Sequence, residues 1–320
     1  MTASVVQLGS ARVQLAAPLG DGVPGALLRT CPAAPAGPAD VRIAPAPRLA
    51  PPAHAGEVAS FFHGSLRAAL RGGGFVLRDG PTEVQVSRDG RLVEVAGAIQ
   101  PADGGSELAV LVGLVLALRH HGLFHLHAAA LQGPGGPGVL VAGASGAGKT
   151  TLALALAAAG LVPLADDAVL ASGREARRVF GIPRPFHLGA RTVAAFPALA
   201  VRLGPPSATG KRPLPFDALG SSRRAPPVCR PDVILLPEIA PAGPSMIARA
   251  SAAEALGALL ECSALLVAPG MPAVPEQLAV LEAIVGTARA ARVRLGEDLL
   301  RAPAAVARAL LAELDVAVAA

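Results

Sequence analysis

The feature that most constrains this chain is an eight-residue stretch, Gly143-Ala-Ser-Gly-Ala-Gly-Lys-Thr150. One glycine, four residues and then Gly-Lys-Thr is the spacing of a loop that wraps a phosphate group between a strand and a helix. The flanks fit, because an apolar run at residues 139–142 precedes the stretch and an Ala- and Leu-rich run at 150–159, closed by Gly160, follows it. The order of strand, loop and helix therefore predicts a phosphate-binding segment in an α/β fold.

The glycines of this stretch give the backbone the freedom to curl. Gly143, Gly146 and Gly148 can turn successive N–H groups inward toward an anion, and the helix N-terminus adds the positive end of its dipole. We therefore expect the whole loop, with the residue after it, to bind the phosphates of a nucleotide. These residues are Gly143, Ala144, Ser145, Gly146, Ala147, Gly148, Lys149, Thr150 and Thr151.

Lysine is rare in this chain, since Lys149 and Lys211 are the only two among 28 basic residues. A compact ammonium reaches between two phosphates, whereas the guanidinium of arginine is a wide planar fork. The compact shape of the ammonium therefore explains why a lysine, and not an arginine, stands at position 149. We expect Lys149 to neutralise the β- and γ-phosphates of ATP and the Thr150 hydroxyl to bind Mg²⁺.

A second apolar run, at residues 161–165, delivers two adjacent carboxylates, Asp166 and Asp167. A helix of ten residues and a strand of five each cover roughly 15 Å, so a right-handed crossover returns the chain to the sheet beside the loop. Both carboxylates are candidates for catalysis, one accepting a proton from an attacking hydroxyl and the other ordering Mg²⁺. The metal is assigned to Thr150 and Asp166, the division of roles between the two acids stays open, and the alternative is a pair that only caps a loop.

Two histidines, His125 and His127, lie two residues apart in the strand expected at 123–131, so their side chains share one face. His127 is the candidate catalytic residue, placed to contact a phosphate or to steer a carboxylate. The alternative for both is a histidine packed and hydrogen-bonded within the core.

Residues 124–131, the loop with its preceding strand, and residues 160–167 together resemble the catalytic core of the HPr kinase/phosphorylase family, and more closely the broad group of HPr-kinase-like proteins. In that family a histidine on the preceding strand, the loop lysine and hydroxyl, and an Asp pair form the site. The matching positions here are His127, Lys149, Thr150, Asp166 and Asp167. The resemblance implies a phosphate-loop kinase core related to phosphoenolpyruvate carboxykinase, which transfers phosphate from ATP to a serine hydroxyl.

The chain departs from the classical bifunctional members of that family. They carry an acidic residue where this chain has Thr151, and their downstream glycine-containing signature is not found, which argues against phosphorylase activity and against HPr as the substrate. The loop also resembles that of transporter ATPases, but no Leu-Ser-Gly-Gly-Gln signature follows it. The apolar run at residues 233–238 has Pro237 where a magnesium-binding Asp would stand, so we interpret it as a core strand.

Composition excludes several other classes of function. The net charge is +5, but the arginines are dispersed and the chain has no Trp or Tyr for base stacking, so no nucleic-acid partner is expected. The longest apolar helix, at residues 108–118, is shorter than the ~20 residues that cross a bilayer, so no membrane partner is expected. Cys31, Cys229 and Cys262 are widely spaced and odd in number, which favours free thiols in the cytoplasm. No secretory signal is evident.

Two domains are expected, a small α+β N-terminal domain at residues 1–105 and a phosphate-loop domain at 106–320. The first is expected to contain strands at 11–16 and 41–44, a helix at 58–70, and a meander at 75–78, 83–87 and 92–95 with turns at Asp79-Gly80 and Asp89-Gly90. The second is expected to end with a helix opened by a capping box at Ser251 and Glu254, a helix at 276–291, a strand at 293–295 and a helix beginning at Pro303.

A basic region rich in Pro and Gly, residues 203–231, separates the loop from the C-terminal elements. It contains Lys211 and is either a lid over ATP, a grip for an acidic peptide, or solvated disorder. Arg184 and Arg191 are candidates for stabilising charge on the transferred phosphoryl group, with a surface ion pair as the alternative.

The sequence thus predicts an ATP- and Mg²⁺-dependent kinase that acts on a hydroxyl group of a protein, peptide or small molecule. The expected acceptor is the hydroxyl of a serine. The alternative from another class is a nucleotide-binding regulatory or scaffold protein without turnover. Assembly into a homo-oligomer stays open.

Overall fold

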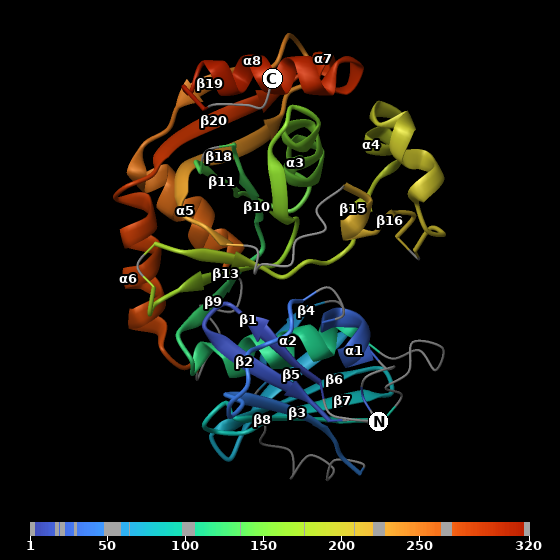
Figure 1. The fold of residues 1–320 in the computed structure, drawn as a ribbon, viewed down its shortest axis with the longest axis vertical. Coiled ribbons are helices and arrows are strands. Elements are labelled where there is room, and N and C mark those ends of the chain that lie inside the picture. The colour runs from blue at the N-terminus through green and yellow to red at the C-terminus, as the bar shows by residue number, and fades with distance from the viewer. Residues whose placement is uncertain are drawn as a thin grey trace. The chain divides into compact units, whose positions relative to one another are not determined.

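The computed structural model describes residues 4–16, 19, 23–28, 31–47, 59–63, 65–97, 106–134, 136–175, 177–207, 209–219, 228–263 and 271–316. These residues form a mixed α/β protein with several sheets (Figure 1). The chain divides into two compact units, the first comprising Met1–His125 with Leu265–Gln277 and the second comprising Leu126–Ala264 with Leu278–Ala320.

The first unit contains an eight-stranded sheet with one long helix against it. In sheet order the strands are β1 (Ser4–Leu8), β2 (Ala11–Leu15), β3 (Val41–Pro45), β8 (Leu92–Ala96), β7 (Thr82–Val86), β6 (Gly74–Asp79), β5 (Leu66–Arg71) and β4 (Ala59–His63). Strands β2, β3 and β8 run parallel to one another, and the remaining neighbours are antiparallel. A short helix, α1 (Val23–Leu28), also belongs to this unit.

Helix α2 (Glu107–Arg119) packs on β6, β7 and β8. Its N-cap is Ser106, whose hydroxyl accepts a hydrogen bond from the N–H of Ala109 and donates one to Asp79 at the end of β6. The sequence predicts this helix in the second domain, with the domain boundary between residues 105 and 106. Residues 98–105, which precede that boundary, lie outside the described residues. The units instead divide at His125 and Leu126, because α2 buries its apolar side chains against the N-terminal sheet.

The predicted meander is confirmed, since β6, β7 and β8 follow one another with antiparallel pairing. The helix predicted at residues 58–70 is wrong, because its described residues form β4 and β5. Leu66 and Ala68 are buried while Arg67 between them is exposed, which is the period of a strand. Pairing of β5 with both β4 and β6 overrides the helix propensity of this Leu- and Ala-rich segment.

The second unit is built on a six-stranded sheet with helices on both faces. In sheet order the strands are β12 (Val162–Ala165), β10 (Ala129–Gln132), β11 (Gly138–Val141), β18 (Pro231–Ile239), β20 (Arg289–Leu295) and β19 (Met246–Arg249). Strands β11, β18 and β20 are parallel, whereas β10 is antiparallel to both β11 and β12. The chain therefore leaves β11 through α3 (Lys149–Ala158), passes over β10 and returns in β12.

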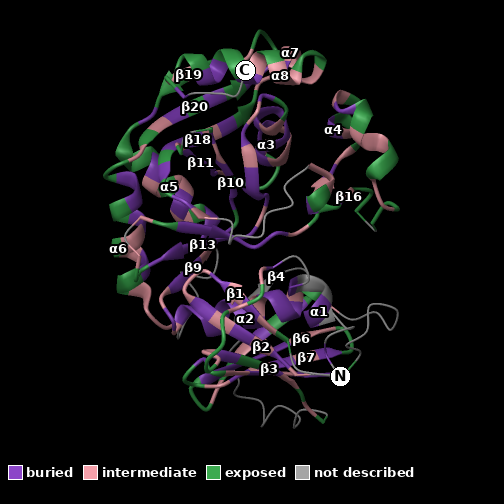
Figure 2. Cartoon of the chain, viewed as in Figure 1, coloured by how far each residue is buried: buried purple, intermediate pink, exposed green. Residues whose placement is uncertain are grey.

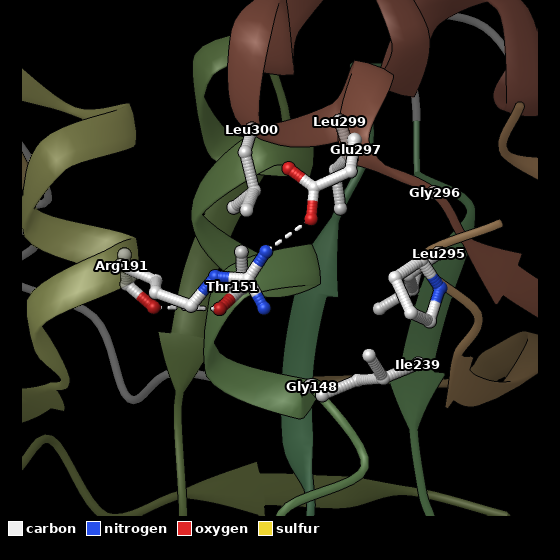
Figure 3. A pocket seen from close by; sticks show the side chains of 11 residues that line it. Gly148, Thr151, Arg191, Ile239, Leu295, Gly296, Glu297, Leu299 and Leu300 are labelled. Atoms are coloured by element: carbon white, nitrogen blue, oxygen red, sulfur yellow. Dashed lines mark hydrogen bonds and ion pairs between the residues drawn. The ribbon is translucent and has the colours of Figure 1, made fainter. Parts of the chain in front are cut away.

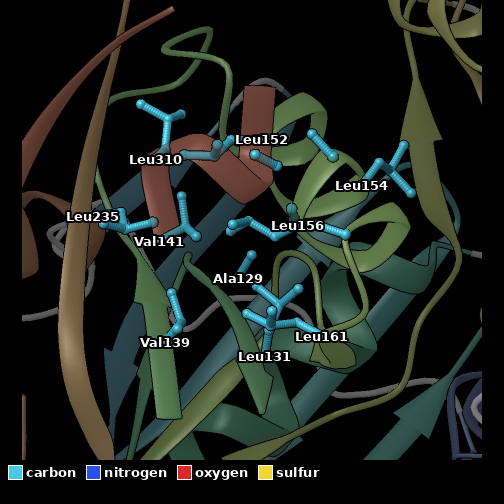
Figure 4. Close-up of a cluster of buried hydrophobic side chains, with 14 of the residues drawn as sticks. Ala129, Leu131, Val139, Val141, Leu152, Leu154, Leu156, Leu161, Leu235 and Leu310 are labelled. Carbon is cyan, nitrogen blue, oxygen red and sulfur yellow. The ribbon is translucent and has the colours of Figure 1, made fainter. Parts of the chain in front are cut away.

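Strand β11 is buried on both faces, as the short apolar run predicts (Figure 2). On one face Val139 and Val141 pack with Leu152 and Leu156 of α3 and with α8 (Pro303–Ala312) (Figure 4). On the other face Leu140 packs in a cluster that includes residues of α5 (Ala252–Cys262) and α6 (Val274–Val285). The strand that leads into the phosphate loop is thus held from both sides.

Helix α7 (Glu297–Arg301) lies between β20 and α8, and the remaining elements of the second unit lie between β12 and β18 in the sequence. They are β13 (Val169–Ser172), β14 (Val179–Gly181), β15 (Phe186–Leu188), α4 (Ala190–Ala195), the 3-10 turn η3 (Pro197–Arg202), β16 (Arg212–Leu214), the 3-10 turn η4 (Phe216–Leu219) and β17 (Val228–Cys229). Strand β14 pairs with β13 and β17, and β15 pairs with β16. The basic region 203–231 therefore contains ordered elements, while residues 208 and 220–227 lie outside the described residues.

Two further predictions for this half of the chain need correction. The strand expected at 123–131 is broken at His127 into β9 (Leu123–Leu126) and β10. The helix expected at 276–291 ends at Val285, because residues 289–295 alternate between buried and exposed and pair as β20 between β18 and β19. The capping box at Ser251 and the start of the last helix at Pro303 are confirmed. Among the described residues, no helix is long and apolar enough to span a bilayer.

The close packing of α2 on its sheet gives a stability test. A β-carbon at Gly113 in α2 would lie 2.6 Å from Cγ1 of buried Val84, whereas one at Gly257 in α5 would meet nothing within 4 Å. We expect Gly113→Ala to destabilise the protein by about 1–3 kcal/mol, since the core must shift to admit the methyl group. Gly257→Ala, the matched control, should stabilise it by about 0.5–1 kcal/mol. Urea unfolding of both variants measures the difference, and equal effects would contradict the tight helix-sheet contact.

Candidate functional site

The loop between β11 and α3 has the conformation that its glycines predict. Gly143, Gly146 and Gly148 have φ angles of 146°, 84° and 98°, values that disfavour any residue with a β-carbon. Gly148 is also the N-cap of α3. Ala144, Ser145 and Gly146 are exposed and Ala147 is half-buried, so the outer part of the loop faces solvent.

Lys149 is buried at the start of α3, and its side chain turns back over the loop. The Nζ ammonium donates hydrogen bonds to the carbonyls of Gly143 at 2.7 Å and Ala144 at 2.9 Å. The pKa of Lys149 lies below its ordinary value, chiefly because burial disfavours the ammonium. An anion over the loop would offset that desolvation and favour the charged form.

Asp166 directly follows β12 and lies against the start of α3. The Thr150 hydroxyl donates to Oδ2 of Asp166 at 3.0 Å, and Oδ1 of the same carboxyl is buried with no hydrogen-bond partner. Asp166 is 4% exposed, and its pKa is raised from 3.8 to about 7, first by burial and then by the charge of Asp167. A buried acceptor without a partner costs roughly 1–3 kcal/mol, which a bound cation would recover.

Asp167 has a different environment. Its Oδ2 accepts a hydrogen bond from Nη1 of Arg184 at 2.9 Å in an ion pair whose side chains are 12% and 22% exposed for Arg184 and Asp167, respectively. Its Oδ1, like that of Asp166, is buried without a hydrogen-bond partner. The two acids are therefore distinguished by their neighbours, one bonded to the loop hydroxyl and the other to an arginine.

His127 lies at the break between β9 and β10, and its backbone N–H donates to the carbonyl of Cys262 at 2.9 Å. Its side chain reaches solvent, yet its pKa is lowered, first because surrounding protein desolvates the imidazolium and next because Lys149 repels it. Asp167 acts in the opposite direction, so the imidazole shares the electrostatic environment of both groups. His125 belongs to the first unit and is half-buried.

Cys262 and Thr192, which the sequence did not assign to this site, contact it, and Lys211 of the basic region acts on it by its charge. The N–H of Gly143 donates to Sγ of buried Cys262 at 3.3 Å, and the hydroxyls of Thr151 and Thr192 lie 2.8 Å apart. Lys211 is exposed, but its charge lowers the pKa values of Asp166 and Lys149. Only Lys211 carried a sequence signal, its rarity, because the other contacts arise from tertiary packing.

The two arginine candidates have separate partners. Arg184 pairs with Asp167 and is thus part of the site. Arg191 in α4 pairs with Glu297 instead, and both side chains are largely exposed. The surface ion pair that the sequence left as an alternative is therefore the observed state of Arg191.

The donor atoms near the loop fit a hard divalent cation. Mg²⁺ takes oxygen ligands and is commonly held by one or two carboxylates together with phosphate oxygens. Thr150 and Asp166 supply such oxygens, and Oδ1 of Asp166 is buried without a partner. Among the described residues no group of three or more His, Cys, Asp or Glu side chains lies close enough together to hold a metal ion.

Comparison with known proteins assigns no family to this site. No protein-family model matches the chain, and no curated protein matches its sequence. The resemblance of residues 124–167 to HPr-kinase-like proteins stays a prediction. Function is therefore inferred from the loop and its carboxylates.

Burial of Asp166 makes the stability of the protein depend on pH. The folded state holds this proton with a pKa of about 7, whereas the ordinary value is 3.8. The folded state therefore loses stability as pH rises from about 4, and the loss is complete above about 7. We expect Asp166→Asn to be more stable than the original chain at about pH 8 by on the order of 2–4 kcal/mol, and equally stable near pH 4. Urea unfolding without nucleotide or Mg²⁺ measures both values.

Asp217 is exposed in η4 and provides the matched control. Asp217→Asn should change the unfolding free energy by less than about 0.5 kcal/mol at either pH. A stability gain in Asp166→Asn that is the same at both pH values would show that the buried charge is not its cause.

Proposed function

We propose that this protein is an ATP- and Mg²⁺-dependent kinase that transfers the γ-phosphate to a hydroxyl group of a protein, peptide or small molecule. The expected acceptor is the hydroxyl of a serine. The observation that carries the proposal is the bond from Thr150 to Asp166, beside a loop of left-handed glycines, with Oδ1 of Asp166 buried and unpartnered. The loop N–H groups and Lys149 would hold the phosphates. Thr150 and Asp166 would hold Mg²⁺, which neutralises charge on the phosphate oxygens when it is bound.

The geometry favours Asp167 as the general base. The pKa of Asp166, about 7, would by itself suit proton transfer at neutral pH. Oδ2 of Asp166, however, already accepts a hydrogen bond from the Thr150 hydroxyl. A cation bound there would lower the pKa of Asp166 again. Asp167 is paired with Arg184 instead of the loop hydroxyl, and its side chain is 22% exposed.

In the proposed reaction the substrate oxygen forms a bond to the γ-phosphorus while the bond from that phosphorus to the bridging oxygen breaks, which leaves ADP. The hydroxyl proton passes to the carboxylate of Asp167, whose side chain is 22% exposed. Arg184 is a positioning residue, because its ion pair fixes the orientation of this carboxylate. His127 would lie at the phosphate side, where its lowered pKa favours a neutral imidazole.

We also propose a cytoplasmic location for this kinase. Cys31, Cys229 and Cys262 are all free and buried. Burial raises the pKa of each thiol, to about 12 for Cys31 and Cys229. Such thiols are unreactive and fit a reducing compartment.

Transfer of label from γ-labelled ATP to a peptide library tests the proposal. We expect the original chain to label serine-containing peptides, and Asp167→Asn to lower the rate by about 10²–10⁴-fold, which is the usual contribution of a general base. Affinity for ATP, measured by calorimetry, should change little because Asp167 does not face the loop hydroxyl. Asp217→Asn is the control and should leave the rate unchanged.

Two results would count against this proposal, one against kinase activity and one against the assignment of the base. ATP binding without label transfer to any peptide or to proteins of a cell extract would favour the regulatory or scaffold protein without turnover. Label transfer that is undiminished in Asp167→Asn would reject this residue as the base.

A further inference from the structure

A cavity of about 130 Å³ opens beside the phosphate loop, within the second unit (Figure 3). Gly148, the last residue of the loop, and Thr151, in the first turn of α3, form one side of it. Ile239 at the end of β18, Leu295 at the end of β20 and Leu299 in α7 (Glu297–Arg301) also line it. A cavity of about 150 Å³ accepts a benzene ring, so this smaller one can take in only part of a larger planar ring.

Loop and cavity are continuous. A β-carbon at Gly148 would lie 2.6 Å from Cδ1 of Leu295 and 3.6 Å from Cγ1 of Ile239. The backbone that would wrap the phosphates therefore lies directly on the apolar wall. A ligand with its phosphates on the loop N–H groups has this cavity as the adjoining space for another part of the molecule.

Ile239 has an unusual exposure for an aliphatic side chain. It is 52% exposed and is one of four large hydrophobic residues exposed in the described part of the chain. Figure 3 shows it beside Gly148 and Leu295, at the rim of the cavity. An exposed apolar side chain next to a phosphate-binding loop is what a ligand with an apolar face would cover.

The polar side chains of the lining are bonded to one another. The hydroxyl of Thr151 pairs with that of Thr192, and the guanidinium of Arg191 pairs with the carboxylate of Glu297 (Figure 3). The other lining residues are apolar or glycine. Contact with the faces of a ring is therefore the main interaction that this cavity provides, and hydrogen bonds to the ring edge are few.

We propose that the apolar lining of this cavity and the exposed side chain of Ile239 contact the face of the purine ring of the nucleotide whose phosphates the loop holds, while the ribose lies outside the cavity. This inference rests on the proposed function and names a subsite of it. Because ring faces differ little between adenine and guanine, the site discriminates weakly between ATP and GTP. Ile239 is the residue that contacts the ring from the solvent side.

The test compares two probes, Mg²⁺-ATP and Mg²⁺-tripolyphosphate, by calorimetry on the full chain. Ile239→Ser should weaken ATP binding by about five- to tenfold, since most of an aliphatic contact is lost, and should leave tripolyphosphate binding unchanged. Met246→Ser is the matched control, because Met246 is 54% exposed on β19 and does not line the cavity. It should alter neither affinity. ATP and GTP should bind the original chain within about tenfold of each other.

Each other outcome rejects a defined part of the idea. Unchanged ATP affinity in Ile239→Ser, or an equal loss for both probes, would overturn the assignment of the cavity to the purine ring. A preference between ATP and GTP above about a hundredfold would overturn recognition by ring faces. An original chain that binds neither probe would reject the phosphate site itself, and with it both the proposed function and this inference.

Discussion

The hydrogen bond between the Thr150 hydroxyl and the Asp166 carboxylate is the contact on which the candidate site depends. It joins the first turn of α3, the helix that crosses over β10, to the residue after β12, the strand in which the crossover ends. The hydrophobic core packs on both faces of β10 and β11. This packing fixes the positions of the Thr150 hydroxyl and the Asp166 carboxylate. The same core removes water from Asp166, so the bond lies where charge is costly and an added cation is most favourable.

Burial favours the uncharged form of every titrating group whose pKa shifts at this site. It raises the pKa of Asp166 and lowers the pKa values of Lys149 and His127, so each group is pushed toward its uncharged form. Fixed neighbours oppose this push only in part, since Arg184 serves one oxygen of Asp167 and Thr150 one oxygen of Asp166. A triphosphate with its metal would supply the missing charges, and protonation of the site would change as it binds.

The candidate site was more predictable than the surrounding fold. The loop, β11 and the return of the chain to Asp166 follow from local patterns, because glycine spacing, an apolar run and a helix length are all readable in sequence. The strands β4 and β5 were missed because Leu- and Ala-rich segments suit helices equally well, and only pairing with β6 decides. The placement of α2 and the contacts of Cys262 and Thr192 depend on residues far away in the chain, which no local pattern encodes.

The resting position of Lys149 has a consequence for how tightly any anion is held. Its ammonium already donates hydrogen bonds to two carbonyls of the loop. A phosphate that binds to this ammonium therefore replaces existing hydrogen bonds instead of satisfying an unbonded donor. Part of the attraction is cancelled by the bonds that must be given up, and the oxygens of Gly143 and Ala144 return to water. These two bonds tie Lys149 to the loop and thereby hold the shape of the loop when no anion is bound.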